Sequence, residues 1–78
     1  MKEQNINKLN KIFMEIFELD ESQVVGYRKI NNRKWDSLAT VTLVAAVESD
    51  FNILLDESTY EVFTSFSAVK LALDEKGL

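Results

Sequence analysis

The stretch from Asp36 to about Phe51 constrains the fold most, because it is a long and largely apolar run without Gly or Pro. Asp36 suits the N-cap position of a helix, since its carboxylate can accept a hydrogen bond from the otherwise unpaired N–H groups of Leu38 or Ala39. Ser37 then lies in the first turn, where the helix dipole and free amides stabilise a bound anion by about 0.3–1 kcal/mol. The sequence therefore predicts a central helix that begins at a solvent-facing hydroxyl.

The side chains of this expected helix fall on two opposite faces when about 100° per residue is assumed. One face, expected to be core, carries Thr40, Leu43, Val44, Val47 and Phe51. The opposite face carries Leu38, Val41, Thr42, Ala45 and Ser49. One helix of a small bundle cannot easily bury both faces, so we expect an exposed apolar strip along Leu38, Val41 and Ala45 that suits partner docking. The alternative is that another segment, such as the loop before the helix, covers these residues.

The residues from Asp36 to Phe51 resemble the Asp-Ser-Leu helix of acyl carrier proteins, a family in which that serine carries a 4′-phosphopantetheine arm. The resemblance covers most of the chain: a leading amphipathic helix, a long loop, the Asp-Ser-Leu helix, a short helix and a closing helix. It implies that residues 1–78 form a single carrier domain, an all-α, four-helix acyl-carrier-like bundle with three main helices and one short helix. The string Asp-Ser-Leu is short and common, and taken alone it favours a Ser37 that only assists the cap. The helix that follows and the size of the chain carry the resemblance.

The resemblance implies a carrier rather than an enzyme. A phosphopantetheinyl transferase would move the 4′-phosphopantetheine of coenzyme A to Ser37, and the thiol of the arm would hold acyl intermediates as thioesters. The implied partners also include the enzymes that load the acyl group and those that accept it. In this family, acidic residues of the central and following helices meet basic patches on partner enzymes, a role that the resemblance gives to Asp36, Glu48 and Glu57.

The sequence departs from the pattern of bacterial fatty-acid carriers. Ala39 and Thr42 stand where those carriers usually have carboxylates, Trp35 replaces a small residue, and the preceding loop is basic rather than acidic. These departures favour a free-standing carrier that serves a dedicated pathway, in fatty-acid-like or specialised biosynthesis of the secondary-metabolite or polysaccharide type. Primary fatty-acid synthesis stays open. An aminoacyl or peptidyl carrier protein and an unmodified helical adaptor are the alternatives.

The chain of 78 residues contains no Cys and no His. No disulfide, thiolate zinc site or cysteine nucleophile is therefore possible, and Ser37 lacks a base that would activate it as in a hydrolase. A chain that carries thioesters without any Cys must take its sulfur from a prosthetic group. The sequence therefore predicts no set of catalytic residues. It predicts no metal site either, since the acidic residues between Glu48 and Glu61 match no EF-hand loop and indicate a solvated face.

The net charge of −4 disfavours nucleic acid and anionic membranes as partners and favours positively charged docking sites on proteins. The loop before the central helix carries a basic cluster made of Arg28, Lys29, Arg33 and Lys34. We expect this cluster to be solvated, or to pair with Asp20, Glu21 or the carboxylates of a partner, rather than to bind nucleic acid. No apolar run approaches the length that a bilayer requires, so a cytoplasmic protein without stable membrane insertion is expected. We also expect a monomer.

Apolar residues spaced by three and four predict a helix over residues 4–18, and a short helix is expected around Thr59–Phe63. Ser65 is expected to cap a last helix that stops near Gly77. Residues 19–34 are expected to form one long loop that contains a short helical turn or packs down through Val24, Val25, Tyr27 and Ile30.

Two further expectations concern packing. Trp35 is expected at the top of the bundle beside Ser37, and the side chains of the connector Ile53–Leu55 are expected to point inward. The predicted core consists of Leu9, Phe13, Ile16, Leu43, Val47, Phe51, Val69 and Leu73.

Overall fold

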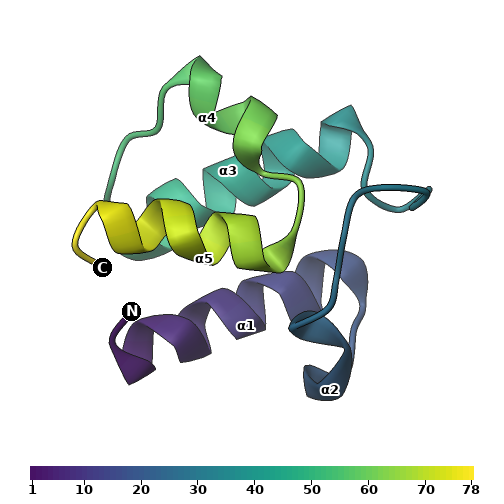
Figure 1. Ribbon diagram of the computed structural model, residues 1–78, viewed down its shortest axis with the longest axis horizontal. Helices are drawn as coiled ribbons and strands as arrows, with labels where there is room; N and C mark the ends of the chain where they lie inside the picture. The colour runs from purple at the N-terminus through teal and green to yellow at the C-terminus, as the bar shows by residue number, and fades with distance from the viewer.

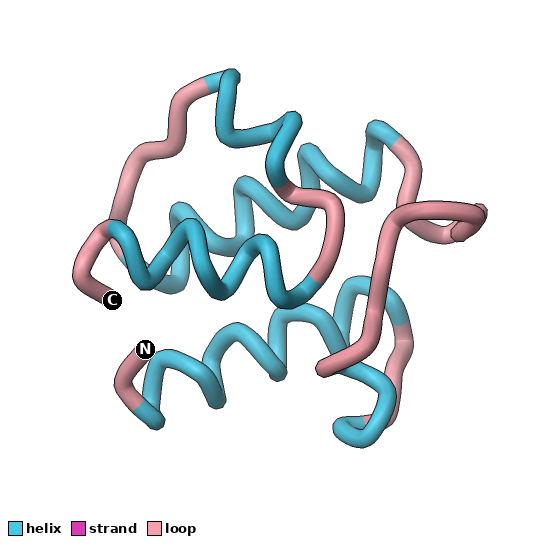
Figure 2. Tube along the Cα trace, in the orientation of Figure 1, coloured by secondary structure: helices cyan, strands magenta, loops and turns pink.

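The structure, a computed structural model that describes residues 1–78, is all-α and contains no strands. Its five helices are α1 (Glu3–Phe17), α2 (Glu21–Val24), α3 (Ser37–Phe51), α4 (Glu57–Val62) and α5 (Phe66–Glu75) (Figure 1). Helix α1 contacts both α3 and α5, and α4 lies across α3 and α5. The trace in Figure 2 consists of helix and loop alone, so the predicted all-α class is confirmed.

The ends of the helices follow from local sequence. α1 and α3 each end where a non-glycine residue adopts the left-handed conformation, Glu18 and Asn52, both with φ of 55°. The Ser65 Oγ accepts a hydrogen bond from the Ala68 N–H at 3.0 Å, which confirms the predicted cap of α5. Helix α4 begins at Glu57, two residues earlier than expected, because the extended backbone at Asp56 makes that residue the N-cap.

The core is one continuous cluster of buried apolar side chains from every part of the chain. It consists of Leu9, Ile12, Phe13, Phe17, Val24, Trp35, Leu43, Val44, Val47, Phe51, Phe63, Phe66, Val69 and Leu73. Seven of the eight predicted core residues belong to it, and Ile16 is only half-buried at its edge. Ile12, which was not predicted as core, is buried on the inward face of α1 instead.

The expected long loop contains α2, a single turn in which the Asp20 N–H donates to the Gln23 Oε1 at 2.8 Å. A short helical turn there is therefore confirmed. Val24 is buried and Tyr27 is half-buried, whereas the expectation was wrong for Val25 and Ile30, which are both exposed.

The second half of this loop is joined by backbone hydrogen bonds to the connection between α4 and α5. The Lys29 N–H donates to the Thr64 carbonyl at 2.9 Å, and the Phe66 N–H donates to the Tyr27 carbonyl at 3.0 Å. This pairing keeps the loop against the bundle although Ile30 contributes nothing to the core. The loop is therefore held by these main-chain hydrogen bonds together with the apolar packing of Val24 and Tyr27.

The connector after α3 also differs from expectation. Ile53 and Leu55 pack partly against the core, but Leu54 is 89% exposed, so the prediction of an inward Leu54 was wrong. Alternate residues of an extended segment point to opposite sides, which sends Leu54 outward when its two neighbours turn inward.

None of the helices combines the length and the apolar character that crossing a bilayer demands.

Candidate functional site

The start of α3 is built around Asp36. The Asp36 Oδ1 accepts a hydrogen bond from the Ala39 N–H at 2.9 Å, and the Asp36 carbonyl accepts one from the Thr40 N–H at 3.0 Å. Asp36 is thus the N-cap, as predicted. Because the capping hydrogen bond is made by the Asp36 carboxylate, the Ser37 side chain is not needed for it. Ser37 is exposed as the first residue of the helix.

Trp35 and Thr40 lie directly beneath this helix start. The indole of Trp35 is 1% exposed, and its Nε1–H donates to the Thr40 Oγ1 at 3.0 Å. The Thr40 hydroxyl in turn donates to the Asp36 carbonyl at 3.2 Å. Trp35 therefore lies deeper than the expected place at the top of the bundle, and it belongs to the core rather than to the surface around Ser37.

Ser37 opens onto a shallow groove of about 240 Å³ between the loop, α3 and α4. The other residues that line it are Lys29, Thr40, Val41, Tyr60 and Glu61. Lys29 and Glu61 bring opposite charges to this groove, and neither was singled out for it by the sequence. No local pattern could have placed them there, because they reach Ser37 only through the packing of α4 and of the loop on α3.

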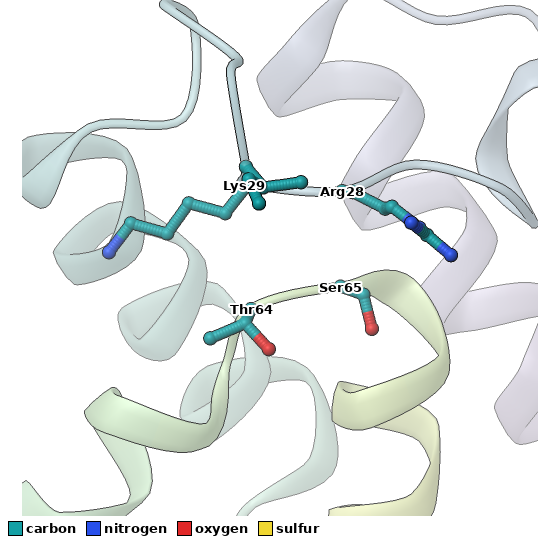
Figure 3. A pocket seen from close by; sticks show the side chains of 5 residues that line it. Arg28, Lys29, Thr64 and Ser65 are labelled. Atoms are coloured by element: carbon teal, nitrogen blue, oxygen red, sulfur yellow. The ribbon is translucent and has the colours of Figure 1, made fainter.

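A second, larger groove of about 640 Å³ continues from Lys29 and is lined by Arg28, Ile30, Thr64 and Ser65 as well. Figure 3 shows Arg28 and Lys29 directing their side chains to opposite sides of the loop, above the connection between α4 and α5.

The basic cluster takes part in no ion pair, because the one ion pair of the chain joins the Met1 ammonium to Asp74. The basic cluster is therefore solvated, and its expected pairing with Asp20 or Glu21 is not formed.

The second face of α3 is exposed, as predicted. Leu38 is 74% exposed and Val41 is 51% exposed, and Ala45 is exposed one turn further along. Neither the loop nor any other segment covers them, which removes the alternative that the sequence left open. An apolar strip, Leu38–Val41–Ala45, thus runs along α3 away from Ser37.

The acidic residues expected to serve partner docking lie in different surroundings. Asp36 is exposed beside Ser37. Glu48 lies eleven residues after Ser37, about 16.5 Å along the axis of α3 at a rise of about 1.5 Å per residue. The half-buried Glu48 accepts a hydrogen bond from the Leu55 N–H at 2.8 Å through its Oε2. Glu57 is exposed at the opposite end of α4 from the part that lines the Ser37 groove, where Glu61 stands.

The chemistry available at this site is limited. Ser37 is a free hydroxyl at a helix N-terminus, and the groove around it holds an ammonium and a carboxylate but no imidazole or thiol. No three side chains of the kinds that ligate metals lie close enough together to hold an ion. Neither a scan against protein-family models nor a search of curated proteins finds a match for this chain.

Proposed function

We propose that the chain is an acyl carrier protein, in which Ser37 bears a 4′-phosphopantetheine arm that holds acyl intermediates as thioesters. The observation that carries the proposal is the exposed Ser37 at the start of the 15-residue α3, with its cap supplied by Asp36. A hydroxyl left free in this way is available for covalent modification. The order of the helices supports an acyl-carrier-like bundle, with α2 as an additional turn in the long loop.

Attachment of the arm is a phosphoryl transfer from coenzyme A. The Ser37 Oγ attacks the phosphorus that bears the pantetheine, the pyrophosphate bond breaks, and adenosine 3′,5′-bisphosphate leaves. In this proposal the hydroxyl proton passes to a base that the transferase supplies. The product phosphodiester lies at the positive end of the α3 dipole, which stabilises its charge by about 0.3–1 kcal/mol. The arm also supplies the thiol that a chain without Cys lacks.

Docking of partner enzymes would use the surface next to the arm. The apolar strip Leu38–Val41–Ala45 and the exposed Asp36 give a small interface, which favours binding that is brief enough for one carrier to visit several enzymes. The arm raises the effective concentration of its cargo at each active site, so weak docking is sufficient. Glu57 and Glu61 on α4 extend this surface with further negative charge.

The test is intact-mass spectrometry of the purified chain after incubation with coenzyme A and a phosphopantetheinyl transferase of broad specificity. We expect a gain of one phosphopantetheine, which Ser37→Ala abolishes. Ser49→Ala is the matched control, because Ser49 is exposed on the same helix but lies far from its N-terminus. A wild-type chain that gains no mass overturns the proposal. The exposed strip would then indicate an unmodified helical adaptor, recognisable by a stable complex that Ser37→Ala leaves intact.

A further inference from the structure

The interior beneath Ser37 is filled by aromatic side chains of the chain itself. The ring centroid of Trp35 lies 4.9 Å from that of Phe17, 5.6 Å from that of Phe13 and 5.8 Å from that of Tyr27. Phe13 also packs edge-on against Phe66 at 5.1 Å. Protein interiors are close-packed and tolerate little added volume. The space between α1, α3 and α5 at the Ser37 end of the bundle is thus taken by side chains.

The layer directly below the attachment point is also polar. A chain that entered the bundle from Ser37 would have to pass the hydrogen bond from Trp35 to Thr40, which is 3.0 Å long and buried. Breaking it would leave the indole N–H without a partner in an apolar surrounding, which is unfavourable. On the α4 side, Val44 and Phe63 are 1% and 0% exposed and belong to the same continuous core.

The groove that Ser37 opens onto lies outside the bundle and offers a place where a carried group can rest. Its exposed lining is mostly apolar, and Val41 and Tyr60 are its two hydrophobic residues, beside the charged groups of Lys29 and Glu61. Apolar atoms of a carried group would be partly removed from water there without entering the core.

From these observations we infer that the group carried on Ser37 stays outside the helix bundle. This inference rests on the proposed function, because it presupposes the arm. It adds where the carried group lies and the reason for it: Trp35 occupies the interior volume into which an apolar chain would otherwise be drawn.

The experiment compares the full-length carrier loaded with arms that differ only in the acyl group. The transferase is supplied with acetyl-, hexanoyl- or decanoyl-coenzyme A, and loading is verified by intact mass. The thermal unfolding midpoint and the fluorescence of Trp35, the only Trp of the chain, are then measured. We expect the midpoint to change by less than about 1 °C across the series and the emission maximum to stay fixed, because the acyl group does not reach the core.

Two variants test whether Trp35 is the side chain that keeps the acyl group out of the bundle. Trp35→Phe keeps an aromatic side chain but frees volume beneath Ser37, so its midpoint is expected to rise with acyl chain length. Leu73→Val is the matched control, because it frees core volume near the C-terminal end of α5, away from Trp35. Its unfolding midpoint is expected to remain independent of acyl chain length. A Trp35→Phe carrier that stays independent of chain length overturns the role given to Trp35.

The remaining outcomes separate the inference from the proposed function. If the transferase adds no mass at all, the proposed function fails and this inference fails with it. If mass is added and the wild-type midpoint rises steadily from acetyl to decanoyl, or the Trp35 emission shifts, the carrier function stands. In that case the inference alone is overturned, since the chain then enters the bundle despite the aromatic filling.

Discussion

The Trp35 indole donates a buried hydrogen bond to the Thr40 hydroxyl at 3.0 Å, and so ties the end of the long loop to the first turns of α3. The Thr40 hydroxyl in turn donates a hydrogen bond to the Asp36 carbonyl at 3.2 Å. Asp36 in turn caps α3 through the Ala39 N–H. The position of Ser37 is thus fixed from below by the core and from the side by the cap.

Thr40→Val is expected to lower the free energy of unfolding by about 1–3 kcal/mol, because it leaves the Trp35 N–H buried without an acceptor. Thr40→Ser retains the acceptor and is expected to lose less. Urea unfolding followed by circular dichroism measures both changes. Thr42→Val is the matched control, since the Thr42 hydroxyl is exposed and bonds only the Leu38 carbonyl of its own helix. Equal stabilities of Thr40→Val and Thr42→Val would contradict the role assigned to the Trp35–Thr40 hydrogen bond.

Asp36 allows its structural and docking contributions to be separated. Asp36→Ala removes the cap and is expected to lower the free energy of unfolding by about 0.5–2 kcal/mol, whereas Asp36→Asn keeps a capping oxygen and most of the stability. If the carboxylate also attracts a basic transferase surface, Asp36→Asn slows the modification of Ser37. The difference from wild type should then shrink at high salt, since exposed charges are screened.

Urea unfolding and the initial rate of mass gain at low and high ionic strength measure the two effects of Asp36. A rate for Asp36→Asn that equals the wild-type rate at low salt would show that this carboxylate acts only as a cap.

The start of α3 was predictable from sequence because capping is local: Asp36, Ser37 and the run that follows lie within one stretch of chain. The exposed face of α3 was predictable as well, because a single helix presents two faces and the bundle can cover only one. The surroundings of Ser37 were not. Trp35 was expected at the top of the bundle beside Ser37 rather than within the core, and Tyr60 and Glu61 were not connected with Ser37, because tertiary packing of α4 and of the loop decides these contacts.

Glu48 shows how a residue chosen for one role can have another. Its Oε2 accepts from the Leu55 N–H and so fixes the connector that follows α3. Glu48→Ala is expected to lower the free energy of unfolding by about 1 kcal/mol through the lost hydrogen bond. Glu48→Gln keeps an acceptor and removes a negative charge from the last turn of α3, where the helix dipole is also negative, so it is expected to be at least as stable as wild type.

The rate of Ser37 modification distinguishes this role of Glu48 from docking. We expect Glu48→Gln to be modified at the wild-type rate, in contrast to Asp36→Asn, because the carboxylate is half-buried and lies far along α3 from Ser37. A slower rate for Glu48→Gln with unchanged stability would instead assign Glu48 to the docking surface.

The apolar strip on α3 can be tested with two exposed leucines, Leu38 within the strip and Leu54 in the connector after α3. Leu38 and Leu54 are 74% and 89% exposed, so replacing either by Asp is expected to change stability by no more than about 0.5 kcal/mol. Leu38→Asp places its carboxylate in the first turn of α3, which the helix dipole favours. Both variants add the same charge. We expect kcat/KM of the transferase to fall about tenfold for Leu38→Asp, as for a contact at the centre of an interface, and to stay near wild type for Leu54→Asp. Equal effects at the two positions would mean that added charge, and not the strip beside Ser37, governs docking.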